Sequence, residues 1–563
     1  MNTEILGIIA MFALSVALAI PFGEYIAKVY AGSKTLLDPV FNPIERFFYK
    51  ASGIDPKKEM TWKQHLVALL TINFVWFLLG MLILMIQGSL PLNPDNNPSM
   101  SPHLAFNTTI SFVVNCNLQH YSGETGLSYL GQMWLMFLQF VSAGTGMAAA
   151  AIIFRAFSDK TTTQLGNFYN FFVKSCTRIL LPVSFIVAII LLFQGTPMTF
   201  EGKDSITTLQ GNTVEVSRGP AAAFIAIKHV GTNGGGFFGT NSAHPLENPS
   251  YFTNMVEMIA QMIIPLAMIF AFGYFIGRKK LSWMIFGVMT VGFLLLTIPN
   301  IGMETNGNPA ISAMGVDNSL GAMEGKEIRL GAAASGFWSI VTTAISTGSV
   351  NAMHDSTMPL SGMNQLLAMM INSFYGGAGV GILNFFIFII LAVFISGLMV
   401  GRTPEFLGKK VEAREMKIAM IIALIHPFFI LIGTGLATAF PHFTAETLNN
   451  PGFHGFSEIL YEYTSSSANN GSGFEGLGDN TQWWNISTGI ILILSRFIPI
   501  IGPVAIAGLL AEKKFIPESE GTLKTDTPTF GLMVFAVIFI VTALSFFPSL
   551  ALGPIAEYFS LYY

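Results

Sequence analysis

Charged residues are scarce in this chain. Only 11% of its 563 residues are Asp, Glu, Lys or Arg, whereas 52% are hydrophobic, and the mean hydropathy is +0.58. This composition is typical of an integral membrane protein, and it argues against a chain of several soluble domains. The longest inside connection, residues 23–65, is too short to hold a nucleotide-binding domain.

Motifs for metal binding, nucleotide binding and disulfides are also missing. The two cysteines, Cys116 and Cys176, form no CxxC motif and allow one disulfide at most. The nine histidines show no HxxxH or HExxH spacing, which disfavours a zinc site, and no Gly-x-x-x-x-Gly-Lys-Ser/Thr phosphate loop is present. The net charge of −4 gives no nucleic-acid footprint. We therefore expect a chain that is not an enzyme on its own, binds no nucleic acid and carries no covalently bound cofactor.

Long apolar runs are what the sequence has instead. Ten of them are long enough to span a bilayer, which predicts an all-α, multi-pass membrane protein. They lie near residues 5–22, 66–87, 127–154, 172–194, 252–276, 282–299, 363–400, 416–440, 484–510 and 530–553. With the N-terminus outside, 22 of the 28 Lys and Arg residues fall in inside connections. Because cytoplasmic loops carry the excess of basic residues, we expect both termini to be extracytoplasmic.

Four short polar turns recur along the chain. Each follows an apolar run that is too short to span; the runs are 103–114, 221–230, 331–345 and 453–467, and the turns are 115–117, 232–234, 346–348 and 469–471. The last positions of the turns are 117, 114 and 123 residues apart, which indicates an internal repeat. Four units of this kind around an axis would bring the turns together at one pore. The alternative is that the turns are ordinary loops outside the membrane.

The repeat predicts a single membrane domain, 1–563, of four membrane–pore-loop–membrane units around a central pore. The expected divisions are a first helix with its loop, four repeat units and a last helix, at 1–65, 66–157, 158–277, 278–412, 413–511 and 512–563.

Backbone carbonyl oxygens in such turns can replace the water around a dehydrated cation. Gly234, Gly348 and Gly471 permit the unusual dihedral angles this requires, and Asn117 holds the matching position in the first unit. Each half-helix would also point its partly negative C-terminal end at the ion. The predicted filter consists of Asn115, Cys116, Asn117, Thr232, Asn233, Gly234, Ser346, Thr347, Gly348, Asn469, Asn470 and Gly471.

Polar residues follow two of the turns. Gln119 and Glu124 come after the first turn, and His354 and Asp355 come after the third. Carboxylates near a membrane pore are functional candidates, so we expect these four side chains to support the filter or line its vestibule. The alternative for His354 and Asp355 is that they form local hydrogen bonds and cap the next helix.

Glycines interrupt the seventh apolar run. Gly376, Gly377, Gly379 and Gly381 favour an unwound segment below the third turn that could act as a gate, although a close-packing kink is the alternative.

Ionisable residues inside apolar helices should face the protein interior because they are costly in lipid. Glu257 in the fifth run and Arg496 in the ninth are of this kind. Arg496 and Arg402 are candidates for a charge barrier on the inner side of the filter, but Arg402 lies at a helix end and could instead extend to the aqueous phase.

Five strings of sequence carry a resemblance to a known family. They are Tyr-Ser-Gly-Glu at 121–124, Gly-Thr-Asn-Gly-Gly-Gly-Phe-Phe at 231–238, Asn-Ala-Met-His-Asp-Ser at 351–356, Gly-Arg-Thr-Pro-Glu-Phe-Leu-Gly-Lys-Lys at 401–410 and Ser-Ser-Ala-Asn-Asn-Gly-Ser at 466–472. They resemble the KdpA family, the potassium-binding and translocating subunits of the bacterial Kdp P-type ATPase. The resemblance covers essentially the whole chain.

The resemblance implies high-affinity K⁺ uptake through the bacterial cytoplasmic membrane and a fold shared with the Trk, Ktr and HKT transporters. It implies a complex with KdpB, which would hydrolyse the ATP, and with KdpC and KdpF. K⁺ would bind at the four turns and pass sideways through a tunnel into KdpB. The chain departs from the familiar pattern at Thr347, where Cys is common, and at Cys116-Asn117-Leu118, where Thr-Asn-Trp is common. These departures bear on affinity rather than on ion identity.

Two other functions are compatible with parts of the sequence. A self-sufficient K⁺ channel or cation symporter of the same fold would share the composition and the four turns. A secondary transporter for an organic solute would explain the glycine-broken helix, but not four repeated half-helices.

Overall fold

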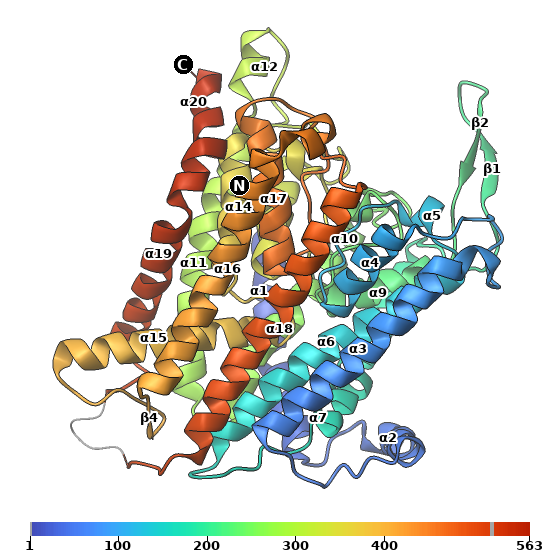
Figure 1. Cartoon of the computed structure of the whole chain (residues 1–563). Coiled ribbons are helices and arrows are strands. Elements are labelled where there is room, and N and C mark those ends of the chain that lie inside the picture. Colours follow the sequence, from blue (N-terminus) through green and yellow to red (C-terminus); the bar gives the residue numbers. More distant parts are fainter. Residues whose placement is uncertain (1–2, 518–522, 563) are drawn as a thin grey trace.

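The computed structural model describes residues 3–517 and 523–562. Ten helices among the described residues are long and apolar enough to cross a membrane, as the sequence predicts. They are Glu4–Ala31, Trp62–Ser89, Tyr129–Ser158, Phe168–Phe193, Tyr251–Phe275, Lys279–Ala313, Val380–Met399, Ala413–Ala439, Gln482–Glu512 and Pro528–Leu561. Figure 1 shows most of them running between the same two ends of the molecule.

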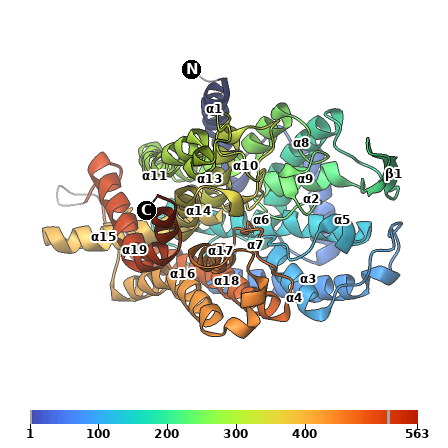
Figure 2. The same ribbon diagram turned by 90° about the horizontal axis from the view of Figure 1, so that it is seen from above.

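Four half-helices lie between the long ones. They are α4 (Pro102–Val113), α9 (Ala221–Val230), α13 (Ala332–Ala344) and α17 (Phe453–Ala468), and they match the four predicted short runs. At 10 to 16 residues they reach roughly 15 to 24 Å, which is less than a bilayer core needs. Seen from above, they surround the centre of the molecule (Figure 2).

A long helix, a half-helix and a second long helix follow one another in four sets, and the third set has the additional helix α14 (Pro359–Ile371) before its second long helix. The sets are α3 (Trp62–Ile86), α4 and α6 (Tyr129–Ser158); α8 (Leu181–Phe193), α9 and α10 (Tyr251–Phe275); α11 (Lys279–Asn306), α13, α14 and α15 (Val380–Val400); and α16 (Ala413–Ala439), α17 and α18 (Gln482–Glu512). The expected unit boundaries stay a prediction. Two further helices flank the units, α1 (Thr3–Ala31) and α19 (Pro528–Leu550).

Burial separates inner helices from outer ones. In the most apolar stretch of α6, 89% of the residues are buried, against 22% in α1 and 28% in α3 and α16. The outer helices expose large apolar side chains, such as Ile9, Val67, Leu424 and Leu544. Exposed apolar faces of this kind are compatible with contact with lipid hydrocarbon. The buried core of the protein therefore lies at the inner helices, next to the half-helices.

The seventh apolar run, 363–400, is interrupted where the glycines predicted an unwound segment, and it forms two separate helices. α14 ends at Ile371, and α15 starts at Val380 after a non-helical segment. Gly376 and Gly379 have φ of +65° and +78°, values that break a right-handed helix and that favour glycine. α15 therefore takes its own direction and runs obliquely to its neighbours (Figure 1).

Both termini lie at the same end of the molecule (Figure 1). The hairpin of β1 (Asp204–Thr207) and β2 (Thr213–Val216) projects at this end, with antiparallel pairing of Asp204 with Val216. The short amphipathic helix α2 (Asp38–Ser52) lies at the opposite end. There the buried Arg178 donates two hydrogen bonds of 2.6 Å to the carboxylate of Glu45 on α2. Neither element was predicted from the sequence. A second small hairpin pairs β3 (Glu405–Phe406) with β4 (Lys409–Lys410).

Candidate functional site

Each half-helix ends in the same backbone motif. One residue after each helix has a left-handed conformation, with φ between 50° and 62°; these residues are Asn115, Thr232, Ser346 and Asn469. The next residue donates its N–H to a carbonyl five positions earlier at 2.8–2.9 Å; the pairs are Cys116 with Ser111, Asn233 with Lys228, Thr347 with Thr342 and Asn470 with Ser465. This is a Schellman motif, and its fourfold occurrence confirms the repeat at the level of the backbone.

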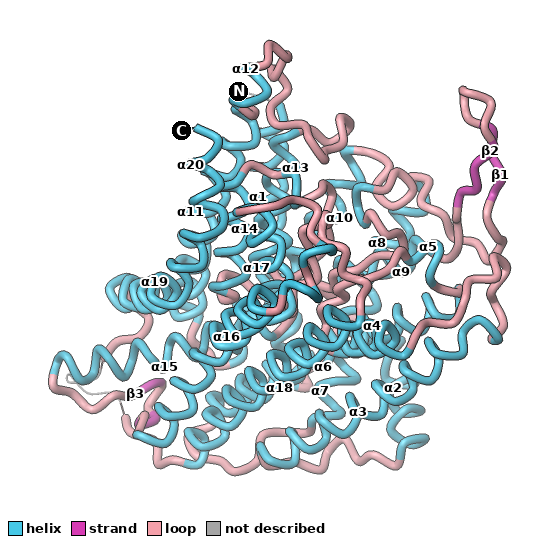
Figure 3. Tube along the Cα trace, turned by 45° about the horizontal axis from the view of Figure 1, so that its top comes forward, coloured by secondary structure: helices cyan, strands magenta, loops and turns pink. Residues whose placement is uncertain are grey.

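The four turns meet one another, and loop segments gather between α4, α9 and α17 (Figure 3). The N–H of Gly234 donates to the carbonyl of Cys116 at 2.9 Å, which joins units two and one. A Cβ added to Gly234 would lie 2.9 Å from the Cα of Gly471, and one added to Gly348 would lie 2.7 Å from the same Cα. The backbones of all four units therefore share a volume too small for side chains.

The predicted left-handed conformation at the third position of each turn is confirmed for three units. The φ angles are 59° at Asn117, 80° at Gly348 and 106° at Gly471. For Gly234 the prediction is wrong, because this residue does not have a positive φ; glycine is needed there because other backbones approach so closely. The first position of the turn was not predicted to be left-handed, but it is so in every unit although none of the four residues is glycine.

The side chain of Asn115 ties the first turn to the second. Its Nδ2 donates to the carbonyl of Thr232 at 2.9 Å. Its Oδ1 accepts hydrogen bonds from Asn233 Nδ2 at 2.6 Å and from Ser142 Oγ at 2.9 Å. Ser142 lies on α6 and was not predicted, because one serine in a long apolar helix gives no sequence signal.

Gln119 and Glu124 hold the glycine stretch of the second unit. Gln119 Nε2 donates to the carbonyl of Gly236 at 3.0 Å, and the N–H of Gly236 donates back to Gln119 Oε1 at 2.9 Å. The N–H of Gly239 donates to Glu124 Oε2 at 2.7 Å. Both side chains therefore contact the glycine stretch that follows the turn of the neighbouring unit, and their role in supporting the filter stays a prediction.

His354 and Asp355 connect the third unit to the fourth. His354 Nδ1 lies 2.9 Å from the hydroxyl of Tyr461, which lies 2.8 Å from the hydroxyl of Ser472 beside the fourth turn. Asp355 Oδ1 accepts from His454 Nε2 at 2.9 Å. Neither side chain caps α14, whose N-cap residue is Met358, so the alternative of a helix cap is wrong.

The glycine segment 376–381 lies against the turns, as predicted. The N–H of Ala378 donates to Thr232 Oγ1 at 2.8 Å, and the N–H of Gly376 donates to the carbonyl of Ala344 at 3.1 Å. A Cβ on Gly377 would stand 3.5 Å from Thr232 and 3.6 Å from Ser346. The segment thus contacts both the second and the third turn, so a displacement of the segment would change its contacts with both turns.

A cavity adjoins the turns on this side. Its polar lining includes Asn115, Ser346, Asn469 and Arg496, and apolar residues of α15, α16 and α19 complete it. Arg496 is 5% exposed, and its Nη2 donates to the carbonyl of Ser142 at 3.4 Å, which confirms that it faces the interior. Arg402 lies exposed in the bend after α15 and does not line the cavity, so it is not placed to form a barrier next to the turns.

A buried charged cluster behind the second turn was missed. Lys228 is fully buried, forms an ion pair with Glu247 and donates to Asn241 Oδ1 at 3.1 Å. His229 Nε2 lies 3.4 Å from Glu257 Oε2. Glu257 is fully buried, as expected, and the burial of Lys228 was not predicted. Lys228 lies in the last turn of a half-helix, where the helix dipole favours a cation, and this position was the signal that could have predicted its burial near the turn.

Comparisons with known proteins identify relatives over nearly the whole chain. The family model described as "KdpA: Potassium-transporting ATPase A subunit" matches residues 9–559. A protein of Flavobacterium johnsoniae named "Potassium-transporting ATPase potassium-binding subunit" is 72% identical over 100% of both chains. A protein of Geobacillus kaustophilus with the same name is 47% identical over 98% of each chain.

A solved structure shares the fold. The crystal structure of the potassium transporter TrkH from Vibrio parahaemolyticus aligns with a TM-score of 0.50, covering 89% of this chain and 98% of that one at 14% identity. The identity is low, so this likeness concerns the fold alone. With ten apolar helices and a family match over nearly its whole length, the chain is an integral, multi-pass membrane protein that belongs to the KdpA family.

Proposed function

We propose that this chain is the potassium-binding and translocating subunit of an ATP-driven, high-affinity K⁺ uptake pump. The names of its relatives support this proposal, since they describe a potassium-binding subunit of a potassium-transporting ATPase. The observation that carries it is the meeting of four left-handed turns in one small volume. In the proposal, K⁺ is the transported ion and the partner subunit uses the ATP.

The proposed filter binds K⁺ through oxygen atoms of the four turns. Carbonyl oxygens lack a full negative charge, so they can replace the hydration shell of the ion and still release it. Four half-helices end at the turns, and the partly negative ends of their dipoles favour a cation there. Among the buried side-chain oxygens of the described residues that lack a hydrogen-bond partner are Asn117 Oδ1, Thr342 Oγ1 and Thr347 Oγ1. Such oxygens suit a cation ligand.

The proposed route from the filter leads into the adjoining cavity. The cavity extends between α15, α16 and α19, and apolar residues such as Ile387, Phe388 and Val541 line it. A buried Arg496 repels K⁺ from the path toward the inner side, which favours lateral transfer to the ATPase partner. The glycine segment 376–381 forms the gate between the second and third turns and the cavity.

The proposed complex contains KdpB as the ATP-hydrolysing subunit, together with KdpC and KdpF, in the bacterial cytoplasmic membrane. Both termini are extracytoplasmic in this arrangement. The alternative is a self-sufficient K⁺ channel or symporter, which the fold shared with TrkH would also permit.

The test is purification of the membrane complex through a tag on this chain. We expect a co-purifying ATPase whose activity rises with micromolar K⁺ but not with the same concentration of Na⁺. If no ATPase co-purifies and the chain reconstituted alone conducts K⁺, the channel or symporter is correct.

A further inference from the structure

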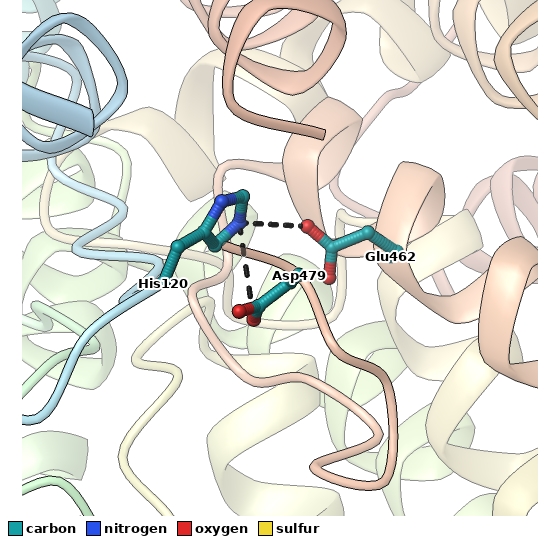
Figure 4. A group of neighbouring side chains, drawn as sticks. All are labelled: His120, Glu462 and Asp479. Carbon is teal, nitrogen blue, oxygen red and sulfur yellow. Dashed lines mark hydrogen bonds and ion pairs between the residues drawn. The ribbon is translucent and has the colours of Figure 1, made fainter. Parts of the chain in front are cut away.

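A cluster of three ionisable side chains lies beyond the first turn (Figure 4). His120 follows that turn by three residues, Glu462 belongs to α17, and Asp479 lies in the loop between the fourth turn and α18. His120 Nε2 is 3.1 Å from Glu462 Oε1 and 4.0 Å from Asp479 Oδ2. One ligand atom from each residue therefore lies within 4.8 Å of the other two.

The imidazole of His120 is fixed in orientation. Its Nδ1 lies 2.9 Å from Asn485 Oδ1, and the amide nitrogen of Asn485 donates to Asn480 Oδ1 at 3.1 Å. Because that oxygen can only accept, Nδ1 carries a hydrogen and Nε2 faces the carboxylates. A second hydrogen bond of this kind is what positions a histidine that ligates a metal.

The cluster is buried yet reachable from one side. His120 is 2% and Glu462 1% exposed, whereas the side chain of Asp479 is 28% exposed and opens the cluster to solvent. His120 Nε2 thus faces two carboxylates that come from different elements of the fold.

We propose that His120, Glu462 and Asp479 form a binding site for a divalent transition-metal ion of the Zn²⁺ class. One imidazole nitrogen and two carboxylates make a three-residue set that Zn²⁺ accepts together with water. Imidazole nitrogen disfavours Mg²⁺ and Ca²⁺, which prefer oxygen ligands. The ligands come from positions 120, 462 and 479, so the absence of a local histidine motif does not bear on this site.

A metal ion at this site would act on K⁺ uptake, a consequence that rests on the proposed function. The ion adds positive charge beside the two carboxylates. It also links the loop after the first turn to α17, and so joins units one and four near the filter. A more positive electrostatic potential near the filter repels K⁺. Zn²⁺ therefore raises the K⁺ concentration needed for half-maximal uptake.

The direct test measures bound metal in the purified full complex. After incubation with Zn²⁺ and desalting, we expect one more Zn²⁺ per complex in the wild type than in His120→Ala or Asp479→Asn. His442→Ala, which removes an exposed histidine outside the cluster, should keep the wild-type content. Asp479→Asn keeps the side-chain size at a partly exposed position, so the test does not depend on His120→Ala folding. Equal zinc content in all four proteins would overturn the proposal.

A second measurement separates this proposal from the proposed function. Co²⁺ in place of Zn²⁺ should give visible absorption bands that require His120 and Asp479, and Mg²⁺ in excess should not remove them. If the bands appear but K⁺ stimulates no activity, the metal site stands and the proposed function fails. If K⁺ stimulates activity but the bands are absent or identical in the variants, the metal site is wrong.

Discussion

Single residues in left-handed conformations set the geometry of the four turns. Asn115, Thr232, Ser346 and Asn469 reverse the chain after each half-helix, and Gly348 and Gly471 allow the backbones to meet. A non-glycine residue in this region costs roughly 1–2 kcal/mol, so the surrounding hydrogen bonds must maintain it. The ties from Asn115 to Thr232, Asn233 and Ser142 supply that support in the first unit.

Gly471→Ala tests the filter at this scale. A Cβ at φ of 106° is strained, and it would contact the carbonyl of Cys116 and lie 3.0 Å from the Cα of Gly234. We expect the K⁺ concentration for half-maximal ATPase stimulation to rise about tenfold or more, equivalent to ~1.4 kcal/mol of binding. The control is Gly473→Ala, whose Cβ would meet only Glu462 Oε2 at 4.0 Å. Equal effects of the two substitutions would remove Gly471 from the filter.

Most of the site was predictable from residue types and spacing, and the exceptions have physical reasons. Asn, Gly and small polar residues after short apolar runs indicated where the four turns lie. The conformation of Gly234 was not predictable, because glycine is compatible both with positive φ and with close approach. Gln119, Glu124 and His354 act across unit boundaries, and contacts between residues more than a hundred positions apart leave no local pattern.

Among the elements, the break between α14 and α15 has the clearest consequence for movement. Gly379 sits at the start of α15 with φ of 78°, and a Cβ there would lie 2.6 Å from the Cα of Met147 on α6. The segment also contacts the second and third turns. At this residue the proposed gate packs so closely against α6 that no side chain would fit.

Gly379→Ala is expected to lower the maximal rate of K⁺-stimulated ATP hydrolysis several-fold, because the gate segment would be displaced from α6. Gly401→Ala provides the control, since Gly401 has φ of 67° at the other end of α15 but open space around its Cβ. Backbone strain is similar in the two variants, whereas the clash with α6 is not. A similar loss of rate in both would mean that strain alone, and not the packing of the gate, causes the effect.

A histidine joins the outer ends of three elements and makes stability depend on pH. His454 on α17 bonds Asp355 at 2.9 Å and Glu557 on α20 (Ala556–Tyr562) at 2.8 Å. Burial lowers the pKa of His454, but these carboxylates raise it to about 10 overall. The usual value is about 6.5. The stabilisation is thus complete below about pH 6.5 and is lost as pH rises toward 10.

We expect the thermal unfolding midpoint of the complex to fall between pH 6.5 and pH 9.5, and to fall less in His454→Gln. His442→Gln is the matched control, because His442 is exposed and forms no ion pair among the described residues. The same pH dependence in His454→Gln and in the wild type would show that the ion pairs of His454 do not contribute.

At the scale of the whole molecule, four units surround a centre and both termini lie at one end. Hydropathy and repeat spacing were sufficient to predict this architecture, because length and polarity constrain a membrane chain so strongly. The small elements α2 and the β1–β2 hairpin escaped prediction. They lie outside the apolar runs, where neither constraint applies.

The orientation can be checked by labelling single cysteines with a membrane-impermeant maleimide. Leu209 lies in the turn of the β1–β2 hairpin, at the end of the molecule where both termini lie, and it is fully exposed. Leu36 lies next to α2, at the opposite end of the molecule, and is 90% exposed. We expect Leu209→Cys to react in intact cells and Leu36→Cys only after the membrane is permeabilised. The reverse pattern would place the termini in the cytoplasm. The background protein needs Cys176→Ser, whereas Cys116 is buried.

The most direct test of the central claim is to locate the bound ion. Tl⁺ substitutes for K⁺ and scatters anomalously, so crystals of the complex in Tl⁺ would show where the cation is held. The account predicts an anomalous peak among Asn117, Gly234, Gly348 and Gly471 that KCl removes and NaCl does not. A peak elsewhere in the chain, with none among the four turns, would contradict it.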